Sequence, residues 1–134
     1  MESQKRPRKV LLIDDSRDLT SLLCSMIKIL GYETAAAYHG MEGIQTAMAF
    51  QPDVIFCDIR LPKMNGFDVA KSIRSIESLK DVYMVAITGY AGRTDMEYAL
   101  ESGFDRFLSK PVDLASIKQV LEEAGERQKA PWMA

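Results

Sequence analysis

The feature that most constrains this chain is an alternation, repeated five times, between a short apolar run and a stripe of apolar residues at helical spacing. The run over residues 10–13 is continuously apolar, which is typical of a strand buried on both faces. Behind it, apolar residues recur at intervals of three and four from Leu19 to Leu30, and Gly31 follows as a helix C-cap. Strands are predicted over residues 10–13, 33–38, 54–57, 82–87 and 104–108, and helices over residues 19–30, 41–48, 69–76, 96–100 and 114–121.

This alternation predicts an α/β fold. Strands that alternate with helices and are buried on two sides form a parallel sheet with helices on both faces. Five units are too few for an eight-fold barrel, so we expect an open, doubly wound five-stranded sheet with five helices. The length of 134 residues suits one domain. We place that domain at residues 9–124, with a charged N-terminal extension at 1–8 and a polar tail or linker stub at 125–134.

Composition narrows the classes of function. The 17 basic and 19 acidic residues give a net charge of −2, which argues against direct nucleic-acid binding. No apolar run approaches the roughly 20 residues of a membrane helix, and the run behind the N-terminus is too short for a signal peptide. We therefore expect a cytoplasmic protein without membrane contact. The two cysteines, Cys24 and Cys57, are expected to be buried hydrophobes, and no role is assigned to the single histidine, His39.

Polar residues with chemical capability follow four of the five predicted strands, namely Asp14-Asp15, Asp58, Thr88 and Lys110. In open α/β sheets, ligands bind beyond the carboxyl ends of the strands, at the point where the strand order reverses. The common order 2-1-3-4-5 places the first and third strands side by side, so the three aspartates should converge there. Any one of these residues alone has a simpler explanation as a helix cap or turn residue. Their shared position at one edge indicates a site.

The mutual repulsion of three carboxylates this close together must be offset by protonation, by a bound cation or by a lysine. A like pair about 4 Å apart costs about 4 kcal/mol at an effective dielectric of about 20. Oxygen ligands without nearby histidine or cysteine favour Mg2+, which accepts carboxylates, water and a phosphate oxygen. Lys110 suits a phosphoryl group as a point charge, Thr88 offers a hydroxyl donor, and a carboxylate is itself a nucleophile. These residues predict metal-assisted phosphoryl transfer onto an aspartate, with Asp58 as the candidate because it stands alone at a central strand end.

Four segments of the chain closely resemble the receiver domain of bacterial response regulators, including the chemotaxis regulators. They are IDDS at 13–16, CDIRLPKMNG at 57–66, ITG at 87–89 and LSKP at 108–111. The resemblance covers residues 9–123 and implies the flavodoxin-like strand order 2-1-3-4-5. It also implies that Asp58 is the phosphoacceptor, that Asp15 binds Mg2+ directly and that Asp14 acts mainly through water. The backbone carbonyl of Arg60 would be the third protein ligand.

The resemblance further implies a switch. Thr88 would move onto the phosphoryl group, Lys110 would pair with it, and Phe107 would take the aromatic switch position. A cis peptide bond is expected between Lys110 and Pro111. The output surface would be formed by the fourth helix, fifth strand and fifth helix, around Tyr90, Tyr98, Phe107 and Lys118. A monomer, or a weak phosphorylation-dependent dimer, is expected.

The implied partners are a histidine kinase or histidine phosphotransfer domain and an unknown downstream output partner. The chain would be a signalling switch that catalyses only its own phosphorylation and dephosphorylation, either alone or as part of a larger regulator or hybrid kinase. Arg60 and Tyr90 flank the acceptor and are predicted to limit water access and slow dephosphorylation.

Two alternative functions are open, and the first shares the fold. A flavodoxin-like binder of flavin or nucleotide needs a loop rich in Ser, Thr and Gly where this chain has Asp14-Asp15. A metal-dependent phosphatase would usually carry a cap or a further acid or base near the nucleophile, and we identify none in the sequence.

Overall fold

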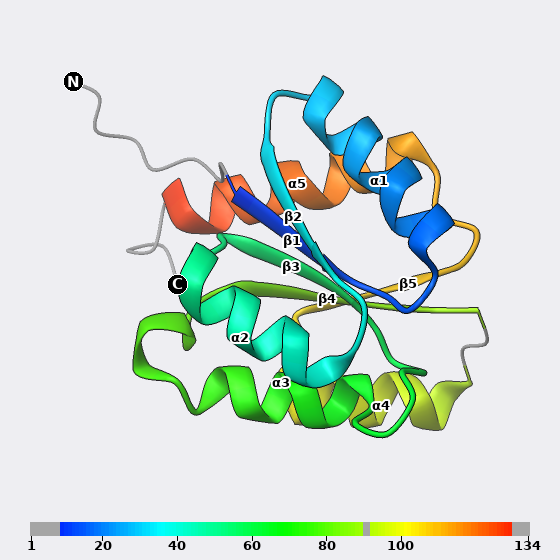
Figure 1. The fold of residues 1–134 in the computed structure, drawn as a ribbon, viewed down its shortest axis with the longest axis vertical. Coiled ribbons are helices and arrows are strands. Elements are labelled where there is room, and N and C mark those ends of the chain that lie inside the picture. The colour runs from blue at the N-terminus through cyan, green and yellow to red at the C-terminus, as the bar shows by residue number, and fades with distance from the viewer. Residues whose placement is uncertain (1–8, 90–91, 130–134) are drawn as a thin grey trace.

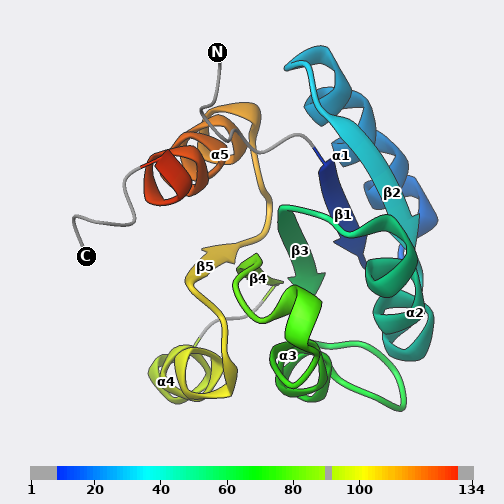
Figure 2. The ribbon, with the colours of Figure 1, turned by 90° about the vertical axis from the view of Figure 1, so that its left-hand side faces the viewer.

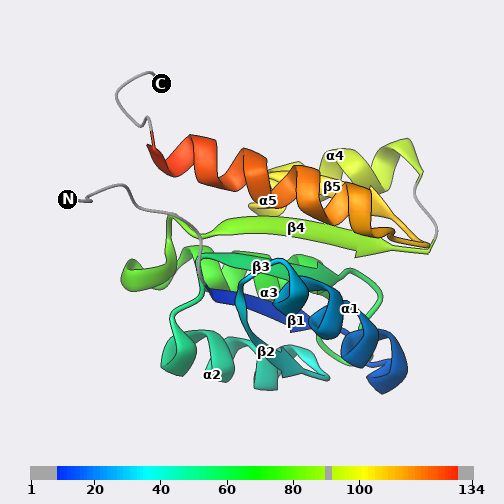
Figure 3. The same cartoon turned by 90° about the horizontal axis from the view of Figure 1, so that it is seen from above.

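A five-stranded parallel sheet runs through the centre of the molecule (Figure 1). The structure is a computed structural model and describes residues 9–89 and 92–129. The strand order is β2-β1-β3-β4-β5, which can be followed across the sheet in Figure 3 and confirms the predicted order. The strands are β1 (Lys9–Ile13), β2 (Glu33–Ala37), β3 (Val54–Asp58), β4 (Tyr83–Thr88) and β5 (Arg106–Ser109).

Helices cover both faces of this sheet (Figure 2). They are α1 (Arg17–Ile29), α2 (Gly40–Phe50), α3 (Gly66–Arg74), α4 (Arg93–Ser102) and α5 (Leu114–Lys129), with a short 3-10 helix, η1 (Glu77–Leu79). One hydrophobic core lies between the sheet and α1 and α5, and the other lies between the sheet and α2, α3 and α4. The doubly wound α/β fold with five α-helices is therefore confirmed.

Burial along the strands explains their composition. Every side chain of β3 and β4 is buried, because these strands lie inside the sheet and have helices on both faces. Strand β5 forms one edge, where three of its residues are half-buried and the last is exposed. It begins at Arg106, two residues later than its sequence predicts, and α5 continues to Lys129, past Gly125 where the tail was expected to begin.

Four helices begin at a side chain that accepts a hydrogen bond from the backbone N–H three residues further on, and Asp113 does this for α5 by accepting from the Ser116 N–H at 2.8 Å. Ser16 does this for α1 and Asn65 for α3, as their residue types favour. His39 does the same for α2 through Nδ1, at 3.3 Å, which is a structural role that the sequence did not indicate. Gly31 follows α1 with a φ of 99°, a left-handed value that suits glycine at a helix end.

The strand register brings the polar residues to one edge. Ile13 pairs with Cys57, Asp58 pairs with Ile87, and Thr88 pairs with Ser109. The residues that follow β1 and those that end β3, β4 and β5 are consequently neighbours in space. Within the part of the chain that the structure describes, we find no helix that is long and apolar enough to cross a membrane.

Candidate functional site

The site is built around three carboxylates from two adjacent strands. Asp14 and Asp15 follow β1 directly, and Asp58 is the last residue of β3. One carboxylate oxygen from each lies within 4.8 Å of the others. Asp14 and Asp58 are buried, whereas Asp15 is exposed. The structure thus brings together the three aspartates that the sequence places at the reversal of strand order.

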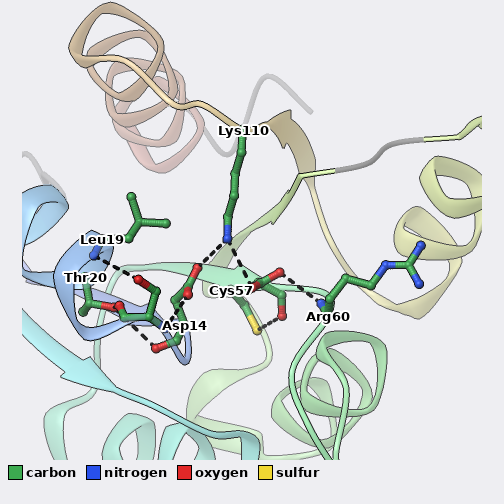
Figure 4. A network of polar contacts seen from close by, with 8 residues as sticks. Asp14, Leu19, Thr20, Cys57, Arg60 and Lys110 are labelled. Atoms are coloured by element: carbon green, nitrogen blue, oxygen red, sulfur yellow. Dashed lines mark hydrogen bonds and ion pairs between the residues drawn. The ribbon is translucent and has the colours of Figure 1, made fainter.

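Backbone hydrogen bonds orient the two buried carboxylates. Ser16 donates its N–H to Asp14 Oδ1 at 2.9 Å, and Arg60 donates its N–H to Asp58 Oδ1 at 3.0 Å. In each case the other oxygen, Oδ2, is directed toward Lys110 (Figure 4). The Lys110 Nζ lies 3.0 Å from Asp14 Oδ2 and 3.3 Å from Asp58 Oδ2. One ammonium group therefore bridges the two buried carboxylates.

The end of β4 positions this lysine. The Lys110 N–H donates to the carbonyl oxygen of Thr88 at 2.8 Å, which fixes the backbone just beyond β5. Thr88 is fully buried, so its side chain lies inside the molecule at the same edge as the carboxylates. The peptide bond between Lys110 and Pro111 is cis, which confirms that prediction.

The electrostatics of the cluster follow from burial and mutual charge. Burial, together with the negative charge of Asp14, raises the pKa of Asp58, although the N–H of Arg60 and the charge of Lys110 act in the opposite direction. Burial alone would lower the pKa of Lys110, but its hydrogen bond to Asp14 and the charge of Asp58 raise it. Lys110 is consequently a cation at neutral pH. Burial also raises the pKa of the Cys57 thiol, so this cysteine is a protonated core residue, as predicted.

Gly66 allows the loop after β3 to return against the end of that strand. A Cβ at this position would lie 2.6 Å from the carbonyl oxygen of Asp58 and 2.7 Å from the Cα of Ile59. The Gly66 N–H also donates to the carbonyl oxygen of Ile59 at 2.8 Å. An Asn-Gly pair is typical of a turn, but the pair does not indicate that the glycine packs directly on the backbone of Asp58.

Comparison with known proteins identifies the family. The response regulator receiver domain model matches residues 10–122. A relative from Brucella anthropi, the polar-differentiation response regulator DivK, is 30% identical over 122 residues, which cover 88% of this chain and 99% of the relative. The chain belongs to the response regulator receiver domain family.

Solved receiver structures agree with this assignment. The chemotaxis protein CheY4 of Vibrio cholerae has a TM-score of 0.84 at 25% identity, covering 88% of this chain and 98% of that one. The receiver domain of the sensor histidine kinase PA1611 of Pseudomonas aeruginosa has a TM-score of 0.82 at 27% identity, and the match covers 90% of this chain and 98% of that one. That structure has a magnesium ion coordinated in its active-site cleft. Nothing in these comparisons favours a flavin binder or a phosphatase.

As a receiver domain, the chain is a signalling component of a two-component system. Receiver domains act as switches, bind Mg2+ at an acidic pocket and interact with histidine kinases or phosphotransfer partners. In this chain, Asp14, Asp15 and Asp58 form a cluster of carboxylates close enough to hold one metal ion.

The Arg60 side chain of this receiver domain lies elsewhere than expected. Its guanidinium Nη2 is 3.0 Å from Asp95 Oδ2 on α4, and it extends away from Asp14 and Lys110 (Figure 4). The guanidinium therefore does not cover the Asp58 carboxylate in this structure. Tyr90, the other residue expected to limit water access, lies outside the described residues.

The residues expected on the output surface differ in burial and in the elements that they contact. Phe107 is half-buried and packs against the core on the side of α2, α3 and α4. Lys118 is exposed on α5. The Tyr98 ring, in contrast, packs against Phe67 of α3 at a centroid distance of 4.5 Å, and its hydroxyl accepts a hydrogen bond from Lys71 Nζ at 2.9 Å. The ring and the hydroxyl of Tyr98 thus both contact α3.

Proposed function

We propose that this receiver domain accepts a phosphoryl group on Asp58 from the phosphohistidine of a histidine kinase or phosphotransfer domain. The observation that carries the proposal is the environment of the Asp58 carboxylate. It is buried at the end of β3, one oxygen is oriented by the Arg60 N–H, and the other lies 3.3 Å from Lys110 Nζ. A nucleophile oriented on one side and paired with a fixed cation on the other suits phosphoryl transfer.

The residues fit a magnesium ion. Their donors are all oxygens, and the three carboxylates lie close enough to share one cation. Asp14, Asp15 and Asp58 would hold the ion together with the backbone carbonyl of Arg60, with Asp15 as a direct ligand and Asp14 acting mainly through water. When bound, Mg2+ supplies positive charge that offsets the charge of the transferred group.

The chain's own groups then carry the transfer. A carboxylate oxygen of Asp58 attacks the phosphorus in line, forming the acyl phosphate bond. The phosphorus–nitrogen bond breaks, and its electron pair stays on the donor imidazole. Lys110 contacts the phosphoryl oxygens with its ammonium group, and the Thr88 hydroxyl donates a hydrogen bond to them.

The proposed output follows from the position of these groups. Thr88 would move toward the phosphoryl group and leave space that Phe107 can fill, repacking the surface of α4, β5 and α5 for an output partner. The Phe107 side chain packs on the side of the sheet where α4 lies, which supports this route. We expect a monomer or a weak phosphorylation-dependent dimer in the cytoplasm, and no catalysis beyond the domain's own phosphorylation and dephosphorylation.

The test is incorporation of labelled phosphate from acetyl phosphate in the presence of Mg2+. Asp58→Asn should incorporate no label, because the amide keeps the shape of the carboxylate and loses the nucleophile. Asp68→Asn, which makes the same change on an exposed residue of α3, should be labelled like the wild type. Normal labelling of Asp58→Asn would refute the assignment.

A further inference from the structure

Arg60 joins the acceptor to helix α4. Its backbone N–H donates to Asp58 Oδ1 at 3.0 Å, while its guanidinium forms an ion pair with Asp95 Oδ2 at 3.0 Å. Asp95 lies in the first turn of α4, 35 residues further along the chain. The Arg60 side chain is 60% exposed and that of Asp95 is 27% exposed, so the pair lies at the surface beside the site.

We propose that Asp95 is a positioning residue for the phosphorylation site: it holds the Arg60 guanidinium away from the phosphoryl position on Asp58. This inference rests on the proposed function. It assigns to Asp95 a role in how strongly the site binds an anionic phosphoryl group, although Asp95 does not itself contact Asp58.

Competition for one guanidinium is the physical basis. A phosphoryl group on Asp58 adds negative charge and acceptor oxygens, and it would lie within one side-chain length of the Arg60 backbone. A guanidinium forms strong, often bidentate, hydrogen bonds with phosphate oxygens. The Asp95 carboxylate and the phosphoryl group are therefore alternative partners of Arg60.

The strength of the ion pair sets the size of the effect. Exposed pairs of this kind shift an equilibrium by about 1.5- to 5-fold. The contact with Asp95 is therefore weak enough for a phosphoryl group to displace it, yet strong enough to reduce the share of Arg60 that is free to bind that group. Removing the Asp95 carboxylate should tighten the binding of a phosphoryl analogue by about the same factor.

A different role for Asp95 must be separated from this one. A carboxylate in the first turn of a helix interacts favourably with the helix dipole, and the N-cap of α4, Gly92, provides no side-chain hydrogen bond. Asp95 therefore also stabilises α4, and its loss would have an effect without Arg60. The two roles differ in whether the effect disappears when the guanidinium is absent.

The experiment measures the dissociation constant of beryllofluoride, a phosphoryl analogue, by calorimetry in Mg2+ buffer. The variants are Asp95→Asn, Arg60→Gln, the double variant, and Asp95→Glu, which keeps the charge. Glu97→Gln is the matched control, because it removes one exposed carboxylate from the same helix. Asp95→Ser serves as a second neutral variant if Asp95→Asn is poorly folded by circular dichroism.

The proposal expects Asp95→Asn to bind beryllofluoride about 1.5- to 5-fold more tightly than the wild type, with Asp95→Glu close to the wild type. Arg60→Gln should bind no more tightly than the wild type, and adding Asp95→Asn to it should change nothing. The idea is wrong if Asp95→Asn leaves the constant unchanged, if it tightens binding equally without Arg60, or if Glu97→Gln has the same effect. A wild-type protein that binds no beryllofluoride would instead overturn the proposed function, and this inference with it.

Discussion

The substitution Asp58→Asn should stabilise the metal-free protein, and the magnitude follows from the site geometry. At 4.8 Å, which is the upper limit of the separation of the carboxylate oxygens, a like pair costs about 3.5 kcal/mol at an effective dielectric of about 20. The repulsion from exposed Asp15 is closer to the value in water, about 1 kcal/mol. Attraction to Lys110 at 3.3 Å contributes about 5 kcal/mol in the opposite direction.

The charge interactions of Asp58 therefore nearly cancel, and the cost of burying its charge decides the sign. The pKa of Asp58 is raised, and burial is the largest cause, so the pKa also indicates that the buried charge is unfavourable. An asparagine keeps an oxygen that can accept the Arg60 N–H, and Lys110 keeps Asp14 as a partner at 3.0 Å. Because no buried charge loses its last partner, we expect a gain of about 1 to 2 kcal/mol in the free energy of unfolding.

The assay is thermal and urea unfolding at pH 7.5 with a chelator. A gain of this size raises the Tm by about 3 to 7 °C in a domain of this length. Asp68→Asn, in the first turn of α3, should by contrast lower the free energy of unfolding by about 0.3 to 1 kcal/mol, because it loses a favourable interaction with the helix dipole. With Mg2+ in the buffer the advantage of Asp58→Asn should shrink, since the cation stabilises the wild type more. A Tm of Asp58→Asn equal to or below that of the wild type in chelator would show that attraction to Lys110 outweighs burial and repulsion.

Three further changes test the metal site, the loop and a helix cap. Asp15→Ala should abolish the rise in Tm that Mg2+ gives the wild type, because a ligand stabilises only the state that binds it. Gly66→Ala should lower the free energy of unfolding by about 1 to 3 kcal/mol in urea, because its Cβ would lie 2.6 Å from the carbonyl oxygen of Asp58. Asp113→Ala should have a lower Tm than the wild type at pH 7. The difference in Tm between the two should become smaller as the pH is lowered toward 2.5. Hydrogen bonds from Ser116 hold the pKa of Asp113 below its ordinary 3.8, so its contribution is present above that value and lost as the pH falls through the lowered pKa.

Each of these changes has a matched control. Asp18→Ala removes a different acidic residue, in the first turn of α1, and should leave the response to Mg2+ intact. Gly89→Ala adds a Cβ that meets no described atom within 4 Å, so it should cost less than Gly66→Ala. Glu101→Ala, an exposed change on α4, should not show the pH-dependent loss of Asp113→Ala. Equal behaviour of a variant and its control would contradict the corresponding argument.

The sheet and the carboxylate cluster could be predicted because both depend on the backbone. Strands β3 and β4 are continuously apolar since both their faces are covered, and that pattern is visible in the sequence. Once the strands are parallel, the residues at their carboxyl ends lie at one edge whatever their side chains do. Asp14, Asp58 and Lys110 therefore meet as the pattern predicts.

Element ends were less predictable, for reasons that lie in the packing. Strand β5 starts two residues late because Phe104, although apolar and buried like a strand residue, donates its N–H to Ala99 of α4 at 3.1 Å and belongs to the end of that helix. Helix α5 continues past Gly125, a residue that usually weakens a helix, over a stretch too polar to show helical spacing. His39 gave no signal as a helix cap, since Ser, Thr, Asp and Asn are the residues expected there.

Arg60 shows where prediction from sequence ends. Its backbone is determined by the loop after β3, so its N–H contact with Asp58 follows from the family pattern of strand and turn. Its side chain is long and 60% exposed, so the local sequence does not fix its partner. The partner that it contacts, Asp95, belongs to a helix that follows another strand, so no local spacing relates the two residues.

The same holds for Tyr98, whose contacts with Phe67 and Lys71 on α3 depend on how two helices pack side by side. The positions of the site residues common to receiver domains thus depend on the backbone, and the sequence pattern shows them. The surface contacts that are particular to this receiver domain join different elements, and only the structure shows them.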